Sequence, residues 1–489
     1  MSVENNAHTI FVSGSNGTSE LEVFSILSLA PLVVLLRNIA LPWIFVGCRF
    51  ASNNYYWPKF LLDFCFLVVP LLLSFTVFCD HISVIITLLI IAMVSLATFS
   101  MCEYCLIDRE KPPLKMVVNQ VIDDEHNPTM FITYLRSMIL IITAICILAV
   151  DFPVFPRRFA KTENYGRSPM DGGTASFVFI FAVVDAFKHH PHKTYEMRRT
   201  RWSSLVRFRR CKWMVSSSTI LLLLGIGRAI ALKLIDYPEH TTEYGVHWNF
   251  FITLFCVRAT SKALGRRFHL IFGLFFILLY QLSLNENSLQ EWLISDKTER
   301  NDFLSANREG IFSLIGYVSF YYLSSAVASF LSSTGIRLKS WFFRSLCLML
   351  ISFIIFALQI VAEHFCGSPS RRIANLPYIL EMLFMHCFAL SAFLFVQLAS
   401  FFGWAAKMPQ FSTDENPFER LNPCLLDAIN NNGMFFFLFA NILTGIINKL
   451  VNAHLWFDKY QSTAVLGVYI FFLCAVVYAR SKKRPKPED

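Results

Sequence analysis

A carboxylate and an ammonium group stand ten residues apart at the point where a long apolar run ends. Asp151 closes the run and Lys161 follows it, and two prolines between them, Pro153 and Pro156, prevent a simple helical continuation. A turn of the chain could therefore bring Lys161 back to Asp151. A carboxylate beside an ammonium group stays ionised and can still accept a proton from a substrate hydroxyl, which is general-base chemistry. A structural ion pair at a membrane boundary is the alternative interpretation.

Two arginines in the same stretch suit an anionic ligand. Arg157 and Arg158 lie between the two prolines and Lys161. A guanidinium group makes two directed hydrogen bonds to a phosphate, so the pair indicates a phosphate or another anionic head group. The alternative is that both side chains only extend toward the membrane interface.

A second polar cluster lies in the segment "EHTTEYGVHWNFF". It contains His240, Glu243, His247 and Asn249, with the two histidines and the glutamate at helical spacing. The HExxH pattern of zinc proteases is absent, and a zinc site would need further ligands. We therefore predict that these residues line a polar, substrate-binding cavity and do not bind a metal.

A third cluster, "SANREGIF", stands directly before an apolar run. Asn307, Arg308 and Glu309 would lie at the amino terminus of a helix, where unpaired N–H groups and the helix dipole favour an anion. We predict that they contact substrate. Simple helix capping by Asn307 or Ser305 is the alternative.

The composition determines which elements must position these clusters. The chain has 489 residues, of which 55% are hydrophobic and only 16% charged, and it contains 50 phenylalanines. A soluble protein is about one quarter charged, so most of this surface faces lipid. The net charge of +9 lies in short loops between apolar runs, which indicates membrane topology and excludes a nucleic-acid partner.

The apolar runs predict an all-α, polytopic integral membrane protein with about 13 transmembrane helices and no soluble domain. The cysteines lie mostly inside these runs, and the one CxxC, Cys102 and Cys105, has no second pair to complete a metal site. Charged residues inside the runs, such as Arg37, Asp63 and Glu363, must be paired or face a cavity. The predicted spans lie near 21–45, 58–78, 82–106, 130–150, 173–190, 214–235, 246–260, 263–284, 310–333, 340–363, 377–403, 432–453 and 462–480.

Basic residues predict the orientation of the chain. A densely basic loop follows the fifth span and a basic tail occupies 481–489, so both are expected on the cytosolic side. Residues 1–20 then form a segment on the opposite side, where Asn16 begins a glycosylation sequon. The spans between, 21–480, are expected to form one multi-span membrane domain.

Three blocks of sequence give the chain a family resemblance. The blocks "FPRRFAKTENYGRSPMDGG", "TTEYGVHWNFF" and "NREGIFSLIGY" resemble the inositol acyltransferases of glycosylphosphatidylinositol-anchor synthesis, the GPI-anchored wall transfer protein family. The resemblance implies an endoplasmic reticulum membrane enzyme with a lumenal amino terminus. It implies transfer of a fatty acyl group, usually palmitoyl, from acyl-CoA to the inositol of glucosaminyl-phosphatidylinositol. Acyl-CoA is then a co-substrate, and no permanently bound cofactor is expected.

The essential Asp and Lys of that family match Asp151 and Lys161 at the same spacing. We expect direct transfer, with Asp151 as general base and Lys161 stabilising the oxyanion, positioning Asp151 or protonating the leaving thiolate. No Ser-His or Cys-His nucleophile arrangement is evident in the sequence. Two other classes remain open: a polytopic lipid transporter or flippase, and a non-catalytic subunit of a lipid-processing complex.

Overall fold

The apolar runs fold into helices. A computed structural model describes residues 14–47, 56–106, 130–189, 217–235, 241–265, 267–286, 289–295, 300–333, 338–407, 424–450 and 458–482. Within these ranges the secondary structure is entirely helical, with no strand. A helix satisfies its own backbone N–H and C=O groups, which lipid cannot do. The predicted all-α fold class is confirmed.

Nine helices in the described part of the chain are long and apolar enough to cross a membrane. The predicted spans at 173–190, 214–235, 246–260 and 263–284 also coincide with helices, although these are not among the nine. The chain is therefore a multi-pass membrane protein, as predicted.

The helices form two compact units. The first contains described residues of Met1–Val23 and Arg157–Phe388, and the second those of Phe24–Pro156 and Ala389–Asp489. Two helices, α2 (Glu20–Gly47) and α17 (Leu376–Lys407), contribute residues to both units. The predicted membrane domain at 21–480 thus contains parts of both units.

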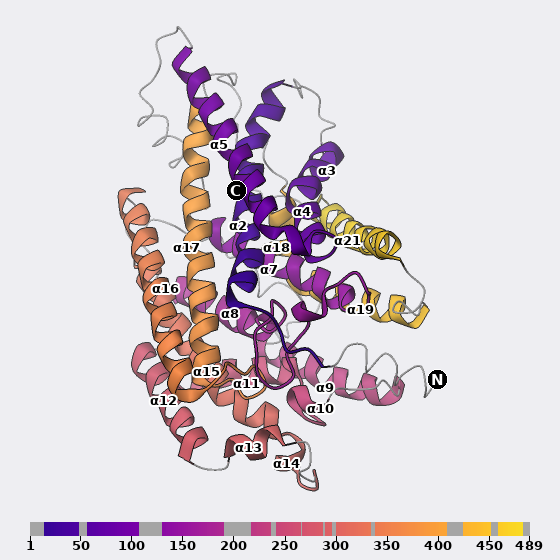
Figure 1. The fold of residues 1–489 in the computed structure, drawn as a ribbon, viewed down its shortest axis with the longest axis vertical. Helices are drawn as coiled ribbons and strands as arrows, with labels where there is room; N and C mark the ends of the chain where they lie inside the picture. The colour runs from indigo at the N-terminus through magenta and orange to yellow at the C-terminus, as the bar shows by residue number, and fades with distance from the viewer. Residues whose placement is uncertain are drawn as a thin grey trace, which may run out of the picture. The chain divides into compact units, whose positions relative to one another are not determined.

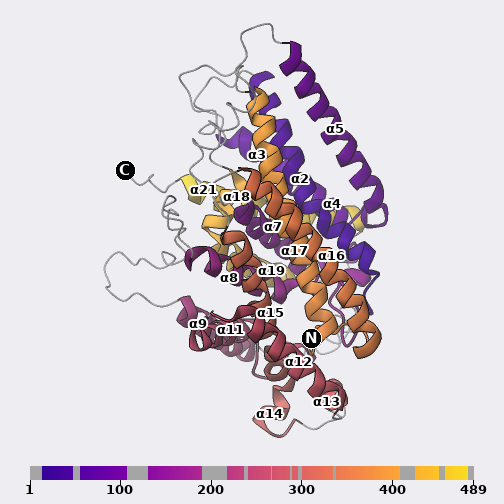
Figure 2. The ribbon, with the colours of Figure 1, turned by 90° about the vertical axis from the view of Figure 1, so that its left-hand side faces the viewer.

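The first unit is built around one buried helix, α15. This helix packs against α8, α11 and α12, and α11 also packs along α9 (Figures 1 and 2). The aromatic rings of Phe356 and Phe384, 4.9 Å apart, join α16 to the first half of α17. The helices of this unit are α8 (Gly173–His189), α9 (Ser217–Ile235), α10 (Thr241–Tyr244), α11 (Phe250–Leu264), α12 (His269–Glu286), α13 (Leu289–Ile294), α14 (Phe303–Ala306), α15 (Arg308–Ser332) and α16 (Leu338–Cys366), with a 3₁₀ turn, η2 (Arg157–Phe159).

Two glycines of α15 let polar loops approach its backbone. A Cβ atom at Gly316 would lie 2.3 Å from the carbonyl oxygen of Ala374, and one at Gly310 would lie 2.4 Å from the Trp248 ring. Both distances are far below van der Waals contact. The glycines therefore place the loop before α17 and the loop before α11 directly on α15.

The second unit contains the remaining helices. In it, α7 packs against α18, α19 and α21, and α18 also packs against α21. The second predicted span, 58–78, is divided in two near Val68, because Pro70 begins a new helix. The helices are α3 (Tyr56–Leu67), α4 (Val69–Phe75), α5 (Ile82–Leu106), α7 (Met130–Ala149), α18 (Leu425–Asn431), α19 (Gly433–Leu450) and α21 (Lys459–Lys482), with a 3₁₀ turn, η1 (Cys79–His81).

Candidate active site

The loop that carries Lys161 is held in place by a buried aspartate. The Asp171 carboxylate accepts hydrogen bonds from the Thr162 backbone N–H at 3.0 Å and from the Thr162 hydroxyl at 2.9 Å. The Tyr378 hydroxyl donates to the Asp171 carbonyl at 2.9 Å. These bonds join the two ends of the segment 162–171 to each other and attach its Asp171 end to α17. Lys161, next to Thr162, is therefore presented from an ordered backbone.

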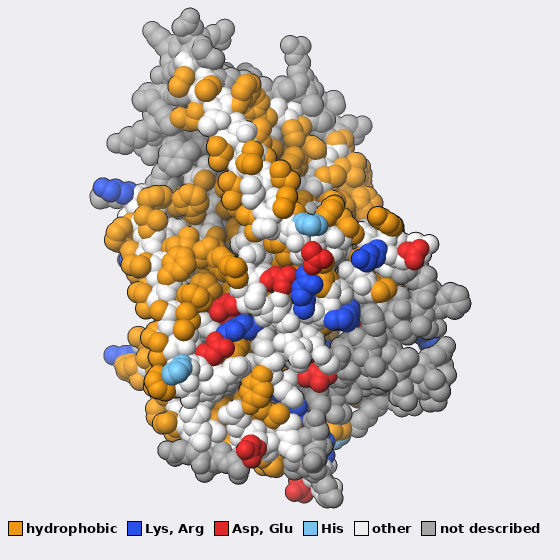
Figure 3. All heavy atoms as spheres, in the orientation of Figure 1, with side chains coloured by type: hydrophobic (Ala, Val, Ile, Leu, Met, Phe, Trp, Pro, Cys, Tyr) orange, Lys and Arg blue, Asp and Glu red, His pale blue; other side chains and the backbone are white. Residues whose placement is uncertain are grey.

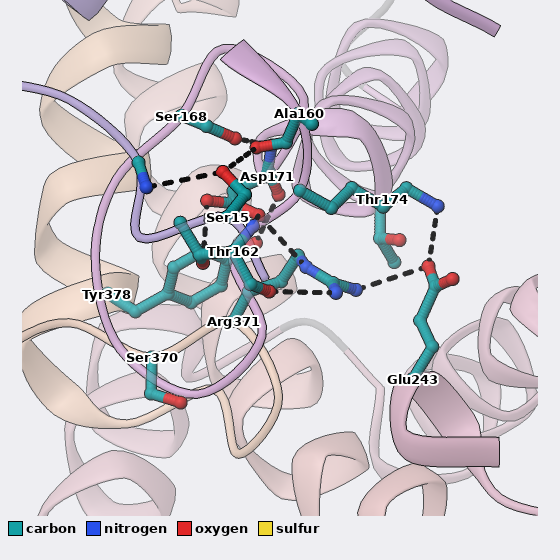
Figure 4. Close-up of polar contacts among 12 residues, drawn as sticks. Ser15, Ala160, Thr162, Ser168, Asp171, Thr174, Glu243, Ser370, Arg371 and Tyr378 are labelled. Atoms are coloured by element: carbon teal, nitrogen blue, oxygen red, sulfur yellow. Dashed lines mark hydrogen bonds and ion pairs between the residues drawn. The ribbon is translucent and has the colours of Figure 1, made fainter. Parts of the chain in front are cut away.

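Lys161 ends a chain of alternating charges. Its Nζ lies 2.8 Å from Glu243 Oε1, and the same oxygen accepts a hydrogen bond from Arg371 Nη1 at 3.1 Å. Arg371 Nε in turn lies 3.0 Å from Asp171 Oδ1. Figure 4 shows Arg371 lying between Asp171 and Glu243. The four side chains, two cations and two carboxylates, balance in charge.

The network shifts the pKa values of Glu243 and Arg371. Burial alone would raise the pKa of Glu243, but Lys161 and Arg371 outweigh it and lower that pKa to about 2. Burial would lower the pKa of Arg371, and the carboxylates of Glu243 and Asp171 raise it above its ordinary value. Glu243 and Arg371 are therefore both ionised at neutral pH.

The structure gives Asp151 and Lys161 different immediate partners. Asp151 is buried, belongs to the second unit and accepts a hydrogen bond from Asn448 Nδ2 at 2.7 Å. Lys161 belongs to the first unit and pairs with Glu243. A direct pairing of Asp151 with Lys161 stays a prediction. The sequence did not indicate either Asn448 or Glu243 as a partner.

Arg158 is held by the start of α2. Its Nη2 lies 3.0 Å from Glu22 Oε1, and its guanidinium carbon lies 5.1 Å from the centre of the Phe159 ring. The carbonyl of Arg157 accepts a hydrogen bond from the Ser15 hydroxyl at 2.9 Å. The two arginines are half-buried, so part of each side chain is accessible. Their contact with a phosphate stays a prediction.

Asn249 and Asn307 make structural hydrogen bonds. Asn249 Oδ1 accepts from the backbone N–H groups of Phe251 and Ile252 and so caps α11. Asn307 Oδ1 accepts from the His247 backbone N–H at 2.7 Å, while the His247 side chain is exposed. His240 lies outside the described residues. A role of these residues in substrate binding stays a prediction.

Glu309 is surrounded by three guanidinium groups. Its Oε1 lies 2.7 Å from Arg300 Nη2, 3.0 Å from Arg372 Nη2 and 3.5 Å from Arg308 Nε. Arg372 Nη1 also donates to Asn164 Oδ1 at 2.8 Å, which connects this cluster to the loop that carries Lys161. The third predicted cluster and the Lys161 loop therefore lie in one polar layer of the first unit.

The structure also contains a serine–histidine pair that the sequence did not reveal. Ser176 Oγ and His386 Nε2 are 2.7 Å apart, and His386 Nδ1 lies 2.6 Å from the Met382 carbonyl oxygen. The carbonyl only accepts, so the proton is assigned to Nδ1 and Nε2 accepts from the serine hydroxyl. The two residues are 210 positions apart, and His386 lies inside an apolar run, so no local pattern marks the pair.

A comparison with known proteins identifies the family. Residues 4–480 match the model of the GWT1 family. The chain belongs to the GWT1 family. This confirms the resemblance carried by the three sequence blocks.

Two mammalian relatives match nearly the whole chain. A GWT1 relative from Mus musculus named glucosaminyl-phosphatidylinositol-acyltransferase PIGW is 32% identical, over 96% of this chain and 96% of its own length. The Homo sapiens protein of the same name is 31% identical over the same shares. The GPI-anchored wall transfer protein 1 of Schizosaccharomyces pombe is 33% identical over 71% of each chain.

Proposed function

We propose that this chain is a membrane-bound acyltransferase of GPI-anchor synthesis that acylates the inositol of glucosaminyl-phosphatidylinositol. The observation that carries the proposal is the match, over 96% of both chains, to relatives named for that activity. The buried polar layer of the first unit, built from the Lys161 loop and from the loops before α11 and α17, supports it, because such a layer suits a lipid with a charged head group. A transporter or a non-catalytic subunit would require these named relatives to have diverged in function.

We further propose the donor and the location. An acyl-CoA, with palmitoyl as the expected chain, supplies the acyl group, and the enzyme lies in the endoplasmic reticulum membrane. The amino terminus is lumenal, with Asn16 as a glycosylation site, and the carboxyl terminus is cytosolic. Asn16 is exposed, which is compatible with modification. Glycosidase digestion of the wild-type protein and of an Asn16→Gln variant tests the glycosylation, and identical mobility shifts would contradict modification at Asn16.

The proposed reaction is a direct transfer. The inositol hydroxyl oxygen bonds to the thioester carbonyl carbon while Asp151 accepts the hydroxyl proton. The carbonyl oxygen becomes negative in the tetrahedral intermediate, where the Lys161 ammonium stabilises it. The carbonyl then re-forms and the C–S bond breaks, and the thiolate of CoA takes up the proton that Asp151 accepted, which restores the carboxylate. No atom of the enzyme is consumed.

The surrounding side chains have supporting roles in this reaction. Glu243 holds the Lys161 ammonium at 2.8 Å and itself stays ionised beside Arg371. Asn448 Nδ2 donates to Asp151 Oδ2 at 2.7 Å and holds that carboxylate in place. In the acceptor lipid, the phosphate is the expected ligand of Arg157 and Arg158.

Four proteins test the roles of Asp151 and Lys161: the wild type, Asp151→Asn, Lys161→Met and the double variant. Purified in detergent, each is assayed with palmitoyl-CoA and glucosaminyl-phosphatidylinositol. Loss of a general base should lower turnover by about 10²–10⁴-fold, and the double variant should be little worse than the worse single one. Glu291→Gln, at an exposed position of α13, is the matched control.

Two results would contradict this assignment. Near wild-type turnover in a folded Asp151→Asn protein would show that Asp151 is not the general base. Recovery of stability and activity in the double variant would show that the two residues form only a structural ion pair.

A further inference from the structure

A group of carboxylates surrounds Arg167 in the first unit, outside the Lys161 network. Arg167 Nε lies 3.3 Å from Glu381 Oε2, and its Nη2 lies 3.8 Å from Glu20 Oε2 and bonds to Glu363. The carboxylates come from three helices: Glu20 begins α2, Glu363 lies in the last turn of α16, and Glu381 lies in the second turn of α17. We call these four residues the Arg167 cluster.

The Arg167 cluster contains more carboxyl groups than cations. Three carboxylates face one guanidinium group, and within the described residues no second cation forms an ion pair with any of the three. The neighbouring cation, Arg158, is paired with Glu22. Carboxyl groups in excess over cations at a membrane boundary must either take up protons or gain a further cation.

Two buried oxygen atoms, one in the cluster and one beside it, lack a hydrogen-bond donor. Gln359 is fully buried, with 0% of its surface exposed, and its Nε2 donates to Glu363 at 3.2 Å. A carboxylate only accepts, so this bond determines the orientation of the amide and leaves Oε1 as an acceptor. Gln359 Oε1 and Glu20 Oε1 are both buried without a partner. Buried acceptors are nearly always satisfied, so these two atoms indicate a donor-rich ligand.

The cluster has a buried floor and an accessible rim. Glu381 is 2% exposed, whereas the side chains of Arg167, Glu20 and Glu363 are 17%, 20% and 29% exposed. Figure 3 shows acidic and basic side chains lying among apolar ones on one face of the molecule. The exposed fractions of Arg167, Glu20 and Glu363 leave these rim residues accessible from outside.

We propose that Glu20, Glu363 and Gln359 bind the ammonium group of the amino sugar in the acceptor lipid. The inference rests on the proposed function, since glucosaminyl-phosphatidylinositol carries an unacetylated amine. A protonated amine supplies one positive charge and three N–H donors, which match the excess carboxylate and the two acceptor oxygens. An N-acetylated sugar has neither the charge nor the donors. The site therefore selects the free amine.

The position of Glu22 agrees with this assignment. Glu22 lies two residues after Glu20 in the first turn of α2, and it holds Arg158, our proposed phosphate ligand. The amine and the phosphate belong to the same small head group. One turn of α2 therefore contributes to binding both ends of that group.

The test compares two acceptors that differ in one group: glucosaminyl-phosphatidylinositol, and the analogue with a hydroxyl in place of the amine. Both binding and acyl transfer are measured on the full-length protein in nanodiscs. Wild type should prefer the amine by about 10–100-fold, as expected for charge-assisted hydrogen bonds. Glu20→Gln should reduce that preference about tenfold through KM for the lipid, with KM for acyl-CoA unchanged.

A second variant separates ligand binding from folding. Gln359→Met keeps the side-chain length and removes both the unpartnered oxygen and the hydrogen bond to Glu363. It should lower the amine preference with only a small loss of thermal stability in the ligand-free protein. Glu291→Gln, an exposed carboxylate on another helix, is the matched control and should keep the wild-type preference.

The outcomes separate this inference from the proposed function. Equal binding of both acceptors by wild type, or an unchanged preference in Glu20→Gln and Gln359→Met, overturns the amine site. Amine-selective binding without any acyl transfer supports the amine site and overturns the proposed function.

Discussion

The charged side chains compared in the two units differ in burial and in how their hydrogen-bond partners are shared. In the second unit, Arg37 Nε and Nη2 both contact Asp63 Oδ1, at 2.9 and 2.8 Å, and Asp63 Oδ2 accepts from the Leu425 backbone N–H at 2.9 Å. Arg37 also donates to Asn38 and Cys424. The side chains of Arg37 and Asp63 are 5% and 0% exposed, so this pair is buried, balanced and fully hydrogen-bonded.

In the first unit, the Lys161 network and the Arg167 cluster contain charges that are shared and partly accessible. Lys161 is 43% exposed, and its partner oxygen on Glu243 also accepts from Arg371. The Arg167 cluster has more carboxylates than cations. The comparison indicates that a buried ion pair whose hydrogen-bonding groups all have protein partners is structural. Charged side chains that share a partner, or outnumber their partners, and that reach solvent can instead exchange a protein partner for a ligand.

The largest expected effect comes from breaking the structural pair. Asp63→Ala leaves a buried guanidinium group unpaired and removes the acceptor at the start of α18. It should lower stability by about 3–5 kcal/mol, measured as thermal unfolding in detergent, with little change in KM for the remaining folded protein. The double variant Arg37→Met with Asp63→Leu should regain much of that loss. Unchanged stability of Asp63→Ala would end the structural interpretation.

The next effect concerns the shared oxygen in the first unit. Glu243→Gln keeps the size and removes the charge that Lys161 and Arg371 share. Losing a charged hydrogen-bond partner should lower kcat/KM by about 10–100-fold, with a smaller loss of stability than Asp63→Ala. Acyl-transfer kinetics and thermal unfolding on the same preparations measure both. If the variant is less stable than the wild type but keeps its kcat/KM, the role of Glu243 is structural.

A smaller effect is expected from pH. The pKa of Glu243 falls from its ordinary 4.5 to about 2 in the folded protein. A carboxylate with a lowered pKa contributes stability above its unfolded pKa and loses it as pH falls through the folded value. Wild type should therefore lose stability between pH 4.5 and pH 2 more steeply than Glu243→Gln. If the stabilities of the wild type and of Glu243→Gln fall in parallel between pH 4.5 and pH 2, the ionised Glu243 does not stabilise the folded protein as expected.

The smallest effect should come from the serine–histidine pair. If transfer is direct, Ser176→Ala removes one hydrogen bond to His386 and should change turnover by less than about threefold. If Ser176 carried the acyl group, turnover would fall by several orders of magnitude. The second readout is mass spectrometry of protein that has reacted with palmitoyl-CoA before the reaction is stopped. An acyl group on Ser176 would contradict direct transfer and indicate an acyl-enzyme intermediate.

The helices could be predicted because each is encoded locally. A run of apolar residues long enough to cross lipid must form a helix, so every predicted span coincides with one. The division near Val68 is also local, since Pro70 is visible in the sequence. The sequence likewise marked Asp63, Arg37 and Glu363 as charges that need partners.

The partners themselves could not be predicted, because they depend on packing between distant helices. Glu243 stands out as a charge in a short loop, but Arg371 is 128 residues away. Asn448 and His386 sit inside apolar runs, where a single polar residue is ordinarily a satisfied part of the core. Glu20 and Glu381 become informative only once Arg167 is seen between them.

The close approach of Ala374 to Gly316 has a consequence for mutations at Gly316. The residue bears no functional group, yet a single added methyl group would collide with the backbone that carries Arg371 and Arg372. An alanine allele at this position would displace both guanidinium groups while leaving every ionisable residue in place. In a screen for loss of function, such an allele would lie in a part of α15 without ionisable residues. Its effect would nevertheless resemble that of a substitution of Arg371 or Arg372.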